Sequence, residues 1–153
     1  MQNKKIDIDS LLYTIERNDI EALRINKNKN RDFFFLKDEI STDQQERWFD
    51  SYSQREDDFM FVCKESEIIF GCMGFRLYEE KIDAYNIMRF CPSQITMETC
   101  MKKMMEFAAE IFPSKQIQVR VLKNNPAISW YEKIGFEKVS DETNFVTLYY
   151  KKS

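Results

Sequence analysis

The absence of histidine limits the acid–base chemistry that this 153-residue chain can perform. A general base must be a carboxylate, a lysine, a tyrosine or a water molecule, and any nucleophile activated by histidine is excluded. The cysteines lie nine or more residues apart, at Cys63, Cys72, Cys91 and Cys100. That spacing predicts free buried thiols in a reducing compartment and no metal site. The candidate for proton transfer is the phenol of Tyr131, within the segment KNNPAISWYEKIGFEKV, residues 123–139.

This segment predicts a short helix over residues 126–134. Asn125 suits the N-cap, Pro126 suits the first helical position, and Gly135 suits the left-handed position after the helix. Tyr131 falls on the apolar face of that helix. From spacing alone, it is either a core tyrosine with one hydrogen bond or a side chain that faces a ligand.

The composition is that of an ordinary soluble protein. Hydrophobic residues make up 43% of the chain and charged residues 32%, with a net charge of −3, which indicates one domain over residues 1–153. Basic and acidic residues are interspersed, so no surface for nucleic acid is indicated. The apolar runs are too short to span a membrane, and the N-terminus lacks the apolar core of a secretory signal. We therefore expect a cytoplasmic protein that binds neither nucleic acid nor membrane.

The elements that position Tyr131 alternate between strands and helices. Strands are expected over residues 11–16, 58–64, 68–78, 81–90, 116–123 and near the C-terminus, with one more near 137–139. Helices are expected over residues 20–25, from Thr42 with a capping box to Gln45, and from Thr96 to Pro113 with apolar residues at helical spacing, Ile111 among them. Residues 33–36, FFFL, are too apolar to stay exposed, and Gly71 and Gly74 mark bulges or close approaches within a strand.

The pattern N-x-x-A-x-x-x-Y-E-K-x-G-F, residues 124–136, resembles the late motif of the GNAT acetyltransferase superfamily. It follows a strand and a long amphipathic helix, as in that family, and the element order is similar along nearly the whole chain. The resemblance implies an α+β fold of three layers, in which a central twisted mixed sheet has helices on both faces. Its two middle strands, residues 81–90 and 116–123, would splay apart, and acetyl-CoA would lie between them as co-substrate, with no metal.

The resemblance also implies a role for individual residues. Tyr131 would be the general acid that protonates the leaving thiolate, since a phenol with a pKa of about 10 stays protonated at neutral pH. Backbone groups around residues 86–89 would bind the pantetheine arm, with the amide of Met88 polarising the acetyl carbonyl. The expected cofactor-binding residues are Ile87, Met88, Arg89, Gln94, Ile95, Thr96, Met97, Glu98, Thr99, Asn124, Ala127 and Tyr131.

The family's phosphate-binding loop, Gln/Arg-x-x-Gly-x-Gly/Ala, has lost its glycines in this chain. When Gln94 is aligned to its first position, Met97 and Thr99 stand at the glycine positions. Glycines there let backbone amides approach a diphosphate at the positive start of a helix, whereas larger side chains crowd it and Glu98 adds a repelling charge. Three outcomes are open: a displaced loop that binds normally, weak binding, or a GNAT-like shell without catalysis.

The N-terminal half carries the acceptor side in this superfamily. Residues 31–48, RDFFFLKDEISTDQQERW, resemble a branch whose members acetylate amino groups of nucleotide-linked sugars or protein N-termini. The expected acceptor is a primary amine of a small molecule, with an amino sugar among the candidates. Glu79 is the expected general base, because this fold would place it beside the mouth of the cleft, and Glu80 and Asp83 are the neighbouring carboxylates.

Two other functions stay open at this point. The missing glycines favour a catalytically inactive GNAT-like module that binds a ligand or a partner protein. The chain could also be a structural α+β domain whose aromatic segments, residues 33–36 and 145–150, form an oligomer interface. Aromatic residues occupy both faces of the last strand, which suggests that at least one face is covered and allows a homodimer.

Overall fold

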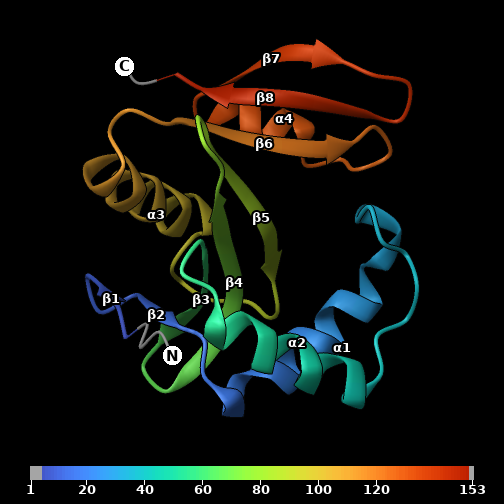
Figure 1. Ribbon diagram of the computed structural model, residues 1–153, viewed down its shortest axis with the longest axis vertical. Coiled ribbons are helices and arrows are strands. Elements are labelled where there is room, and N and C mark those ends of the chain that lie inside the picture. The colour runs from blue at the N-terminus through green and yellow to red at the C-terminus, as the bar shows by residue number, and fades with distance from the viewer. Residues whose placement is uncertain (1–4, 152–153) are drawn as a thin grey trace.

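The computed structural model describes residues 5–151, and its strands form one mixed sheet in the order β1-β2-β3-β4-β5-β6-β8-β7 (Figure 1). The strands are β1 (Asp7–Ile8), β2 (Leu12–Thr14), β3 (Asp58–Glu65), β4 (Ile68–Leu77), β5 (Lys81–Arg89), β6 (Gln116–Leu122), β7 (Phe136–Asp141) and β8 (Phe145–Tyr150). The helices are α1 (Ile20–Lys29), α2 (Thr42–Gln54), α3 (Met97–Ile111) and α4 (Ile128–Lys133), with 3-10 turns η1 (Arg17–Asp19) and η2 (Arg31–Phe33). The mixed α+β architecture expected from the sequence is confirmed.

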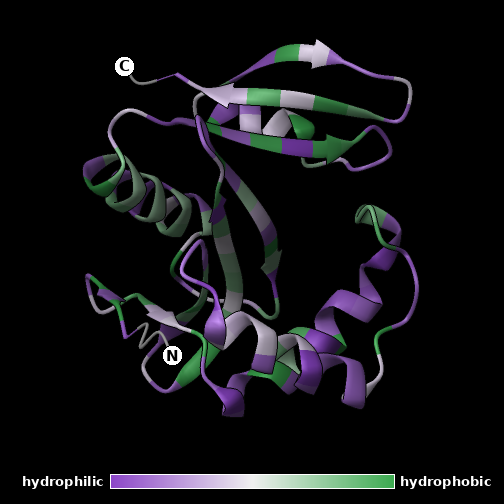
Figure 2. Cartoon of the chain, in the orientation of Figure 1, coloured by the Kyte–Doolittle hydropathy of each residue, from purple (hydrophilic) through white to green (hydrophobic). Residues whose placement is uncertain are grey.

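Helices cover both faces of this sheet, so the protein has three layers. Helices α3 and α4 pack on one face through a cluster of apolar side chains that includes Met101, Met104 and Tyr131. Helices α1 and α2 pack on the other face through a second cluster that includes Leu23 and Tyr52. The sheet therefore has apolar side chains on both faces, and Figure 2 shows hydrophobic residues along β4 and β5.

The two glycines of β4 lie where the backbone has no room for a side chain. A Cβ atom on Gly71 would lie 2.7 Å from the carbonyl oxygen of Met88 and 2.9 Å from the sulfur of Met97. A Cβ atom on Gly74 would lie 2.5 Å from the carbonyl oxygen of Phe59, and the register of β4 with β5 shifts beside this glycine. The expected bulge and close approaches are both present.

Helix α1 is longer than the sequence predicted. It continues to Lys29 because asparagine side chains bond to carbonyls one turn back: Asn26 Nδ2 donates to Ala22 O at 2.8 Å and Asn30 Nδ2 donates to Asn26 O at 2.8 Å. Helix α2 begins with a capping box one residue earlier than expected, with Ser41 as its N-cap and Gln44 as its partner.

Three further expectations about local structure were wrong. Helix α4 starts at Ile128, because the side chain of Asn125 accepts from Ala127 N at 2.9 Å in a turn that precedes the helix. Ile111 is exposed at the end of α3. The FFFL segment is not fully buried: Leu36 is 82% exposed, and Figure 2 shows hydrophobic residues at the turn after α1.

Gly135 has a φ angle of 117° after α4, as the sequence predicted for this position. None of the helices within residues 5–151 combines the length and apolarity that a membrane span requires.

Candidate active site

Strands β5 and β6 separate halfway along their length. They pair in parallel from Lys81 with Gln116 to Ala84 with Val119, and no pairing between them follows in the described chain. Immediately beyond this point Asn86 adopts a φ angle of 52°, next to the irregular register of β5 with β4. The bulge turns the second half of β5 away from β6, which leaves a wedge between the two strands.

The edge of β5 inside the wedge offers backbone amides. Phe90 N donates to Phe70 O of the β4 side at 2.7 Å. Because amides alternate between the two sides of a strand, the Met88 amide faces β4 as well, and the amides of Ile87 and Arg89 face the wedge. This alternation favours Ile87 and Arg89 over Met88, the residue expected from the sequence, as donors towards the wedge.

A cavity of about 610 Å³, the α3 cavity, opens on one side of the wedge. Its walls come from the end of β5, the start of α3 and the face of α4. The lining residues are Ile87, Met88, Arg89, Thr96, Met97, Glu98, Ala127, Trp130, Tyr131 and Lys133.

The start of α3 presents free backbone amides to the α3 cavity. Thr96 caps the helix by accepting from Thr99 N at 3.1 Å, and Cys100 N donates to Thr96 O. The amides of Met97 and Glu98 precede the first intrahelical bond, so an anion can bind there at the positive end of the helix. The Glu98 carboxylate opposes such an anion, and Lys102 Nζ, at 3.4 Å, partly neutralises it.

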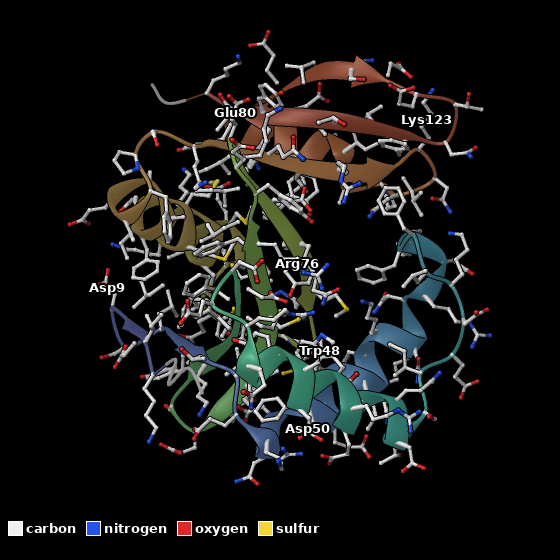
Figure 3. The ribbon with its side chains drawn as sticks, in the orientation of Figure 1. Asp9, Trp48, Asp50, Arg76, Glu80 and Lys123 are labelled. Atoms are coloured by element: carbon white, nitrogen blue, oxygen red, sulfur yellow. The ribbon has the colours of Figure 1, made fainter. Side chains whose placement is uncertain are left out.

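A second cavity of about 810 Å³, the α1 cavity, lies on the other side of the wedge. Helices α1 and α2, the segment between them, β4, β5 and β6 all contribute to its walls. Its aromatic side chains are Phe33, Phe34, Phe35, Trp48, Tyr85 and Tyr131, and its charged side chains are Lys27, Asp38, Glu39, Arg76, Asp83, Arg89 and Arg120. Figure 3 shows Arg76 in the middle of the molecule, with Trp48 of α2 below it.

The two cavities meet at a shared wall made of Ile87, Met88, Arg89, Ala127 and Tyr131. Tyr131 is 6% exposed, and its hydroxyl has no hydrogen-bond partner among residues 5–151. Burial raises the pKa of this phenol above its usual value of 10, which keeps it protonated. A protonated hydroxyl that has no partner within residues 5–151 and lies in the wall of two cavities can donate a hydrogen bond or a proton to a ligand there.

Asp83 is the buried carboxylate of the α1 cavity. It belongs to the paired half of β5, opposite Gln118, one residue before the strands part. Gln118 Nε2 donates to Asp83 Oδ1 at 3.0 Å, and Arg120 Nη2 lies 3.4 Å from Asp83 Oδ2. The guanidinium of Arg120 also lies 5.4 Å from the centre of the Phe35 ring, so Arg120 connects the wedge to the exposed apolar segment.

The structure brings most of the sequence-predicted site residues together. Ile87, Met88, Arg89, Thr96, Met97, Glu98, Ala127 and Tyr131 all line the α3 cavity. The residues that line neither cavity are Glu79, Gln94, Ile95, Thr99 and Asn124.

Local bonds explain where these five residues lie. The Gln94 amide donates to Glu65, the Ile95 carbonyl accepts from Arg89, and Thr99 bonds to the cap. The Asn124 side chain donates to Asp32 O at 3.1 Å, outside the α3 cavity. Glu79 lies at the hairpin tip before β5, next to the paired end of the strands, where Figure 3 shows its neighbour Glu80.

Sequence reasoning missed two residues of the α3 cavity and almost all of the α1 cavity. Trp130 and Lys133 line the α3 cavity from α4; their positions three residues apart flank Tyr131 on the helix, a signal that helical spacing could have provided. Lys27, Arg76 and Arg120 come from three separate elements and carry no local signal.

Comparison with known proteins agrees with this architecture. Residues 12–151 match the family described as "Acetyltransferase (GNAT) domain". The chain therefore belongs to the GNAT acetyltransferase family. No curated protein sequence matches it at a significant level.

Solved structures of low sequence identity share the fold. One is spermidine N-acetyltransferase from Vibrio cholerae in complex with CoA and spermine, with a TM-score of 0.76 and 18% identity, covering 90% of this chain and 92% of that one. Another is the N-acetyltransferase PseH from Campylobacter jejuni, with a TM-score of 0.72 and 18% identity, covering 93% and 97%. A third is FdhC, described as a nucleotide-linked sugar GNAT, with a TM-score of 0.73 and 15% identity, covering 97% and 90%.

Proposed function

We propose that the protein is an acetyl-CoA-dependent N-acetyltransferase that acts on a primary amine of a small molecule, with an amino sugar as one candidate acceptor. The observation that carries this proposal is the unpartnered hydroxyl of Tyr131 at the shared wall of two cavities. Two-substrate transfer needs such an arrangement, in which donor and acceptor enter from different sides and meet at one acid. The fold neighbours named as acetyltransferases of spermidine and of nucleotide-linked sugars support the choice of an amine.

The α3 cavity suits the donor. Its free amides at Met97 and Glu98 would hold the diphosphate, and the amides of Ile87 and Arg89 would bond to the pantetheine arm along the open edge of β5. The Ile87 amide, beside the bulge at Asn86, is our candidate for the donor that polarises the thioester carbonyl.

The transfer step requires three proton movements. The amine nitrogen attacks the thioester carbonyl carbon, the new C–N bond forms, and the C–S bond breaks. Tyr131 gives its proton to the departing sulfur, and an ammonium acceptor loses two protons in all, one to solvent and one that restores the Tyr131 phenol. The product pair is an N-acetyl amide and a free thiol.

Asp83 takes the role of the acceptor-side carboxylate in this proposal. It lines the α1 cavity beside the point where the strands part, whereas Glu79 lines neither cavity. The carboxylate would attract the ammonium form of the acceptor and accept its proton directly or through water.

Thermal unfolding with coenzyme A tests donor binding, with adenosine diphosphate as the fragment control. A ligand present at 100 times its Kd stabilises the folded protein by about 2.7 kcal/mol, a rise of several degrees in Tm. Thiol release from acetyl-CoA in the presence of glucosamine, spermidine or a peptide N-terminus then tests transfer. The absence of a Tm shift at millimolar coenzyme A would contradict the proposal.

A GNAT-like module without catalysis is the second candidate, because one observation favours it. Glu98 lines the α3 cavity at the start of α3, where its charge opposes a diphosphate. Under this alternative, coenzyme A gives no Tm shift in the wild-type protein or in Tyr131→Phe. Under the enzyme proposal both proteins bind coenzyme A, and only the wild type releases thiol at the full rate.

A further inference from the structure

Some of the acidic and basic side chains of the α1 cavity form ion pairs, and one of its walls carries cations alone. Asp83 pairs with Arg120, and Glu39 pairs with Arg31 at 3.4 Å. Asp38 is exposed in the segment between α1 and α2. The wall formed by α1 and β4 contributes only cations, Lys27 and Arg76.

Lys27 is a half-buried cation of the α1 cavity. Within residues 5–151 it has no carboxylate partner, and its Nζ atom lies 5.0 Å from the centre of the Phe34 ring. Burial lowers the pKa of Lys27, and the nearby guanidinium of Arg76 lowers it as well. A partly desolvated ammonium beside a second cation is unfavourable unless an anion joins them.

Arg76 shares a carboxylate, that of Asp58, with another arginine. Arg76 Nε lies 3.2 Å from Asp58 Oδ2, and Arg55 Nη2 lies 2.8 Å from the same oxygen. Asp58 also accepts from the hydroxyl of Tyr85, and Arg76 stacks over the Tyr85 ring at 4.2 Å. Two arginines therefore share one buried carboxylate, and Arg76, the one that reaches the cavity, is held in a fixed orientation.

We propose that the acceptor carries an anionic group, a carboxylate or a phosphate, that binds between Lys27 and Arg76 while its amine reaches the wedge at Asp83 and Tyr131. This inference rests on the proposed transferase function and specifies its substrate class. Phe34, Trp48 and Tyr85 provide aromatic surface for the carbon part of such a molecule. The same arrangement disfavours polyamines, because their second ammonium would meet Lys27 and Arg76.

Matched pairs of acceptors test the proposal by turnover. Glucosamine 6-phosphate is compared with glucosamine, and 4-aminobutyrate with butylamine, so that the phosphate and carboxylate forms are tested separately. We expect the anionic member of at least one pair to have a kcat/KM about 10-fold higher, an effect of about 1.4 kcal/mol. Spermidine is the cationic comparison, and a higher kcat/KM for spermidine than for all anionic acceptors would overturn the proposal.

Two variants on α1 separate the loss of the anion preference from a general loss of activity. Lys27→Gln should remove the preference for the member with the anionic group, while the member that lacks this group keeps its kcat/KM. Lys29→Gln, an exposed lysine at the end of α1, is the control and should retain the preference. Equal losses for both members of a pair in Lys27→Gln would overturn the proposal. Because Lys27 has no carboxylate partner within residues 5–151, its replacement should not lower the Tm of the free protein.

A measurement without turnover keeps this proposal separate from the enzyme proposal. Inorganic phosphate is added to protein already mixed with excess coenzyme A, with sodium chloride of equal ionic strength as the reference. We expect phosphate to raise the Tm of the wild type and of Lys29→Gln but not that of Lys27→Gln. No rise in the wild type, or an equal rise in Lys27→Gln, overturns the anion site. If coenzyme A alone fails to raise the Tm, the proposed transferase function is overturned. The effect of phosphate on the Tm still tests the anion site in that case.

Discussion

The α3 cavity and the α1 cavity meet at one wall but are built differently. The α3 cavity takes its residues from two short stretches of chain, 87–98 and 127–133, and its polar groups include free backbone amides. The α1 cavity takes its residues from six helices and strands, the turn η2 and the segments between them, and its polar groups include seven charged side chains. Backbone amides are present whatever the side chains are, so the α3 cavity can keep its ligand when its sequence changes. In the α1 cavity, a substitution of a charged side chain should change which ligand binds.

The shared wall belongs to both cavities, and it contains Tyr131. Of the substitutions considered, Tyr131→Phe should cause the largest loss of activity. Removing the phenol removes the acid for the leaving thiolate, so we expect kcat to fall about 10²-fold. The Kd of coenzyme A and the Tm should stay close to those of the wild type, because the hydroxyl makes no hydrogen bond within residues 5–151. Steady-state kinetics and thermal unfolding provide both measurements.

Tyr150→Phe is the matched control for that variant. Tyr150 packs against the same apolar cluster, with its ring 5.3 Å from that of Phe136, and lines neither cavity. The pH profile adds a second criterion: since burial raises the pKa of Tyr131, the phenol stays protonated through pH 10, and the alkaline fall in kcat that it causes should lie above about pH 10. A profile unchanged in Tyr131→Phe would contradict its role as acid.

A pair of glycine substitutions should distinguish damage to the α3 cavity from damage to the sheet. In Gly71→Ala the new Cβ would lie 2.7 Å from Met88 O and 2.9 Å from Met97 Sδ, two residues that line the α3 cavity. We expect a loss of about 1–3 kcal/mol of stability together with weaker coenzyme A binding. Gly74→Ala, whose Cβ would meet Phe59 O at 2.5 Å, should lose stability without a comparable change in Kd. Equal changes in Kd would show that Gly71 has no particular connection to the cavity.

The sequence predicts the α3 cavity better than the α1 cavity, because the α3 cavity is built from two short stretches of chain and the α1 cavity from many. The helix cap at Thr96, the amphipathic helix behind it and the turn before Tyr131 are local patterns, and the family resemblance that rests on such patterns implied most of the residues of the α3 cavity. Asn124 and Glu79 line neither cavity, and they contact Asp32 and Lys115, which are far away in the sequence. The wall that carries Lys27 and Arg76 depends on the packing of α1 against β4, and nothing in the local sequence around either residue indicates it.

Asp83→Asn should affect the acceptor side alone. The substitution keeps the shape of the side chain and removes the charge that attracts an ammonium, so we expect kcat/KM for the acceptor to fall about 10-fold at neutral pH. The Kd of coenzyme A should not change, since Asp83 does not line the α3 cavity. Glu79→Gln is the control and should leave both quantities unchanged, because Glu79 lines neither cavity. A larger loss in Glu79→Gln than in Asp83→Asn would reverse the assignment of the two carboxylates.

Glu98→Gln should have the smallest effect, and its two consequences should have opposite signs. Removal of the negative charge at the start of α3 should tighten coenzyme A binding about 2–3-fold at low ionic strength, with a smaller gain at high salt. The same change should lower stability by about 0.3–1 kcal/mol, because an acidic side chain in the first turn stabilises the helix. Glu106→Gln, on the exposed middle of α3, is the control and should change neither. If Glu98→Gln instead weakens coenzyme A binding, the Glu98 side chain makes a favourable contact with the coenzyme. That contact would then compensate in part for the missing glycines of this loop, although the charge of Glu98 opposes the diphosphate.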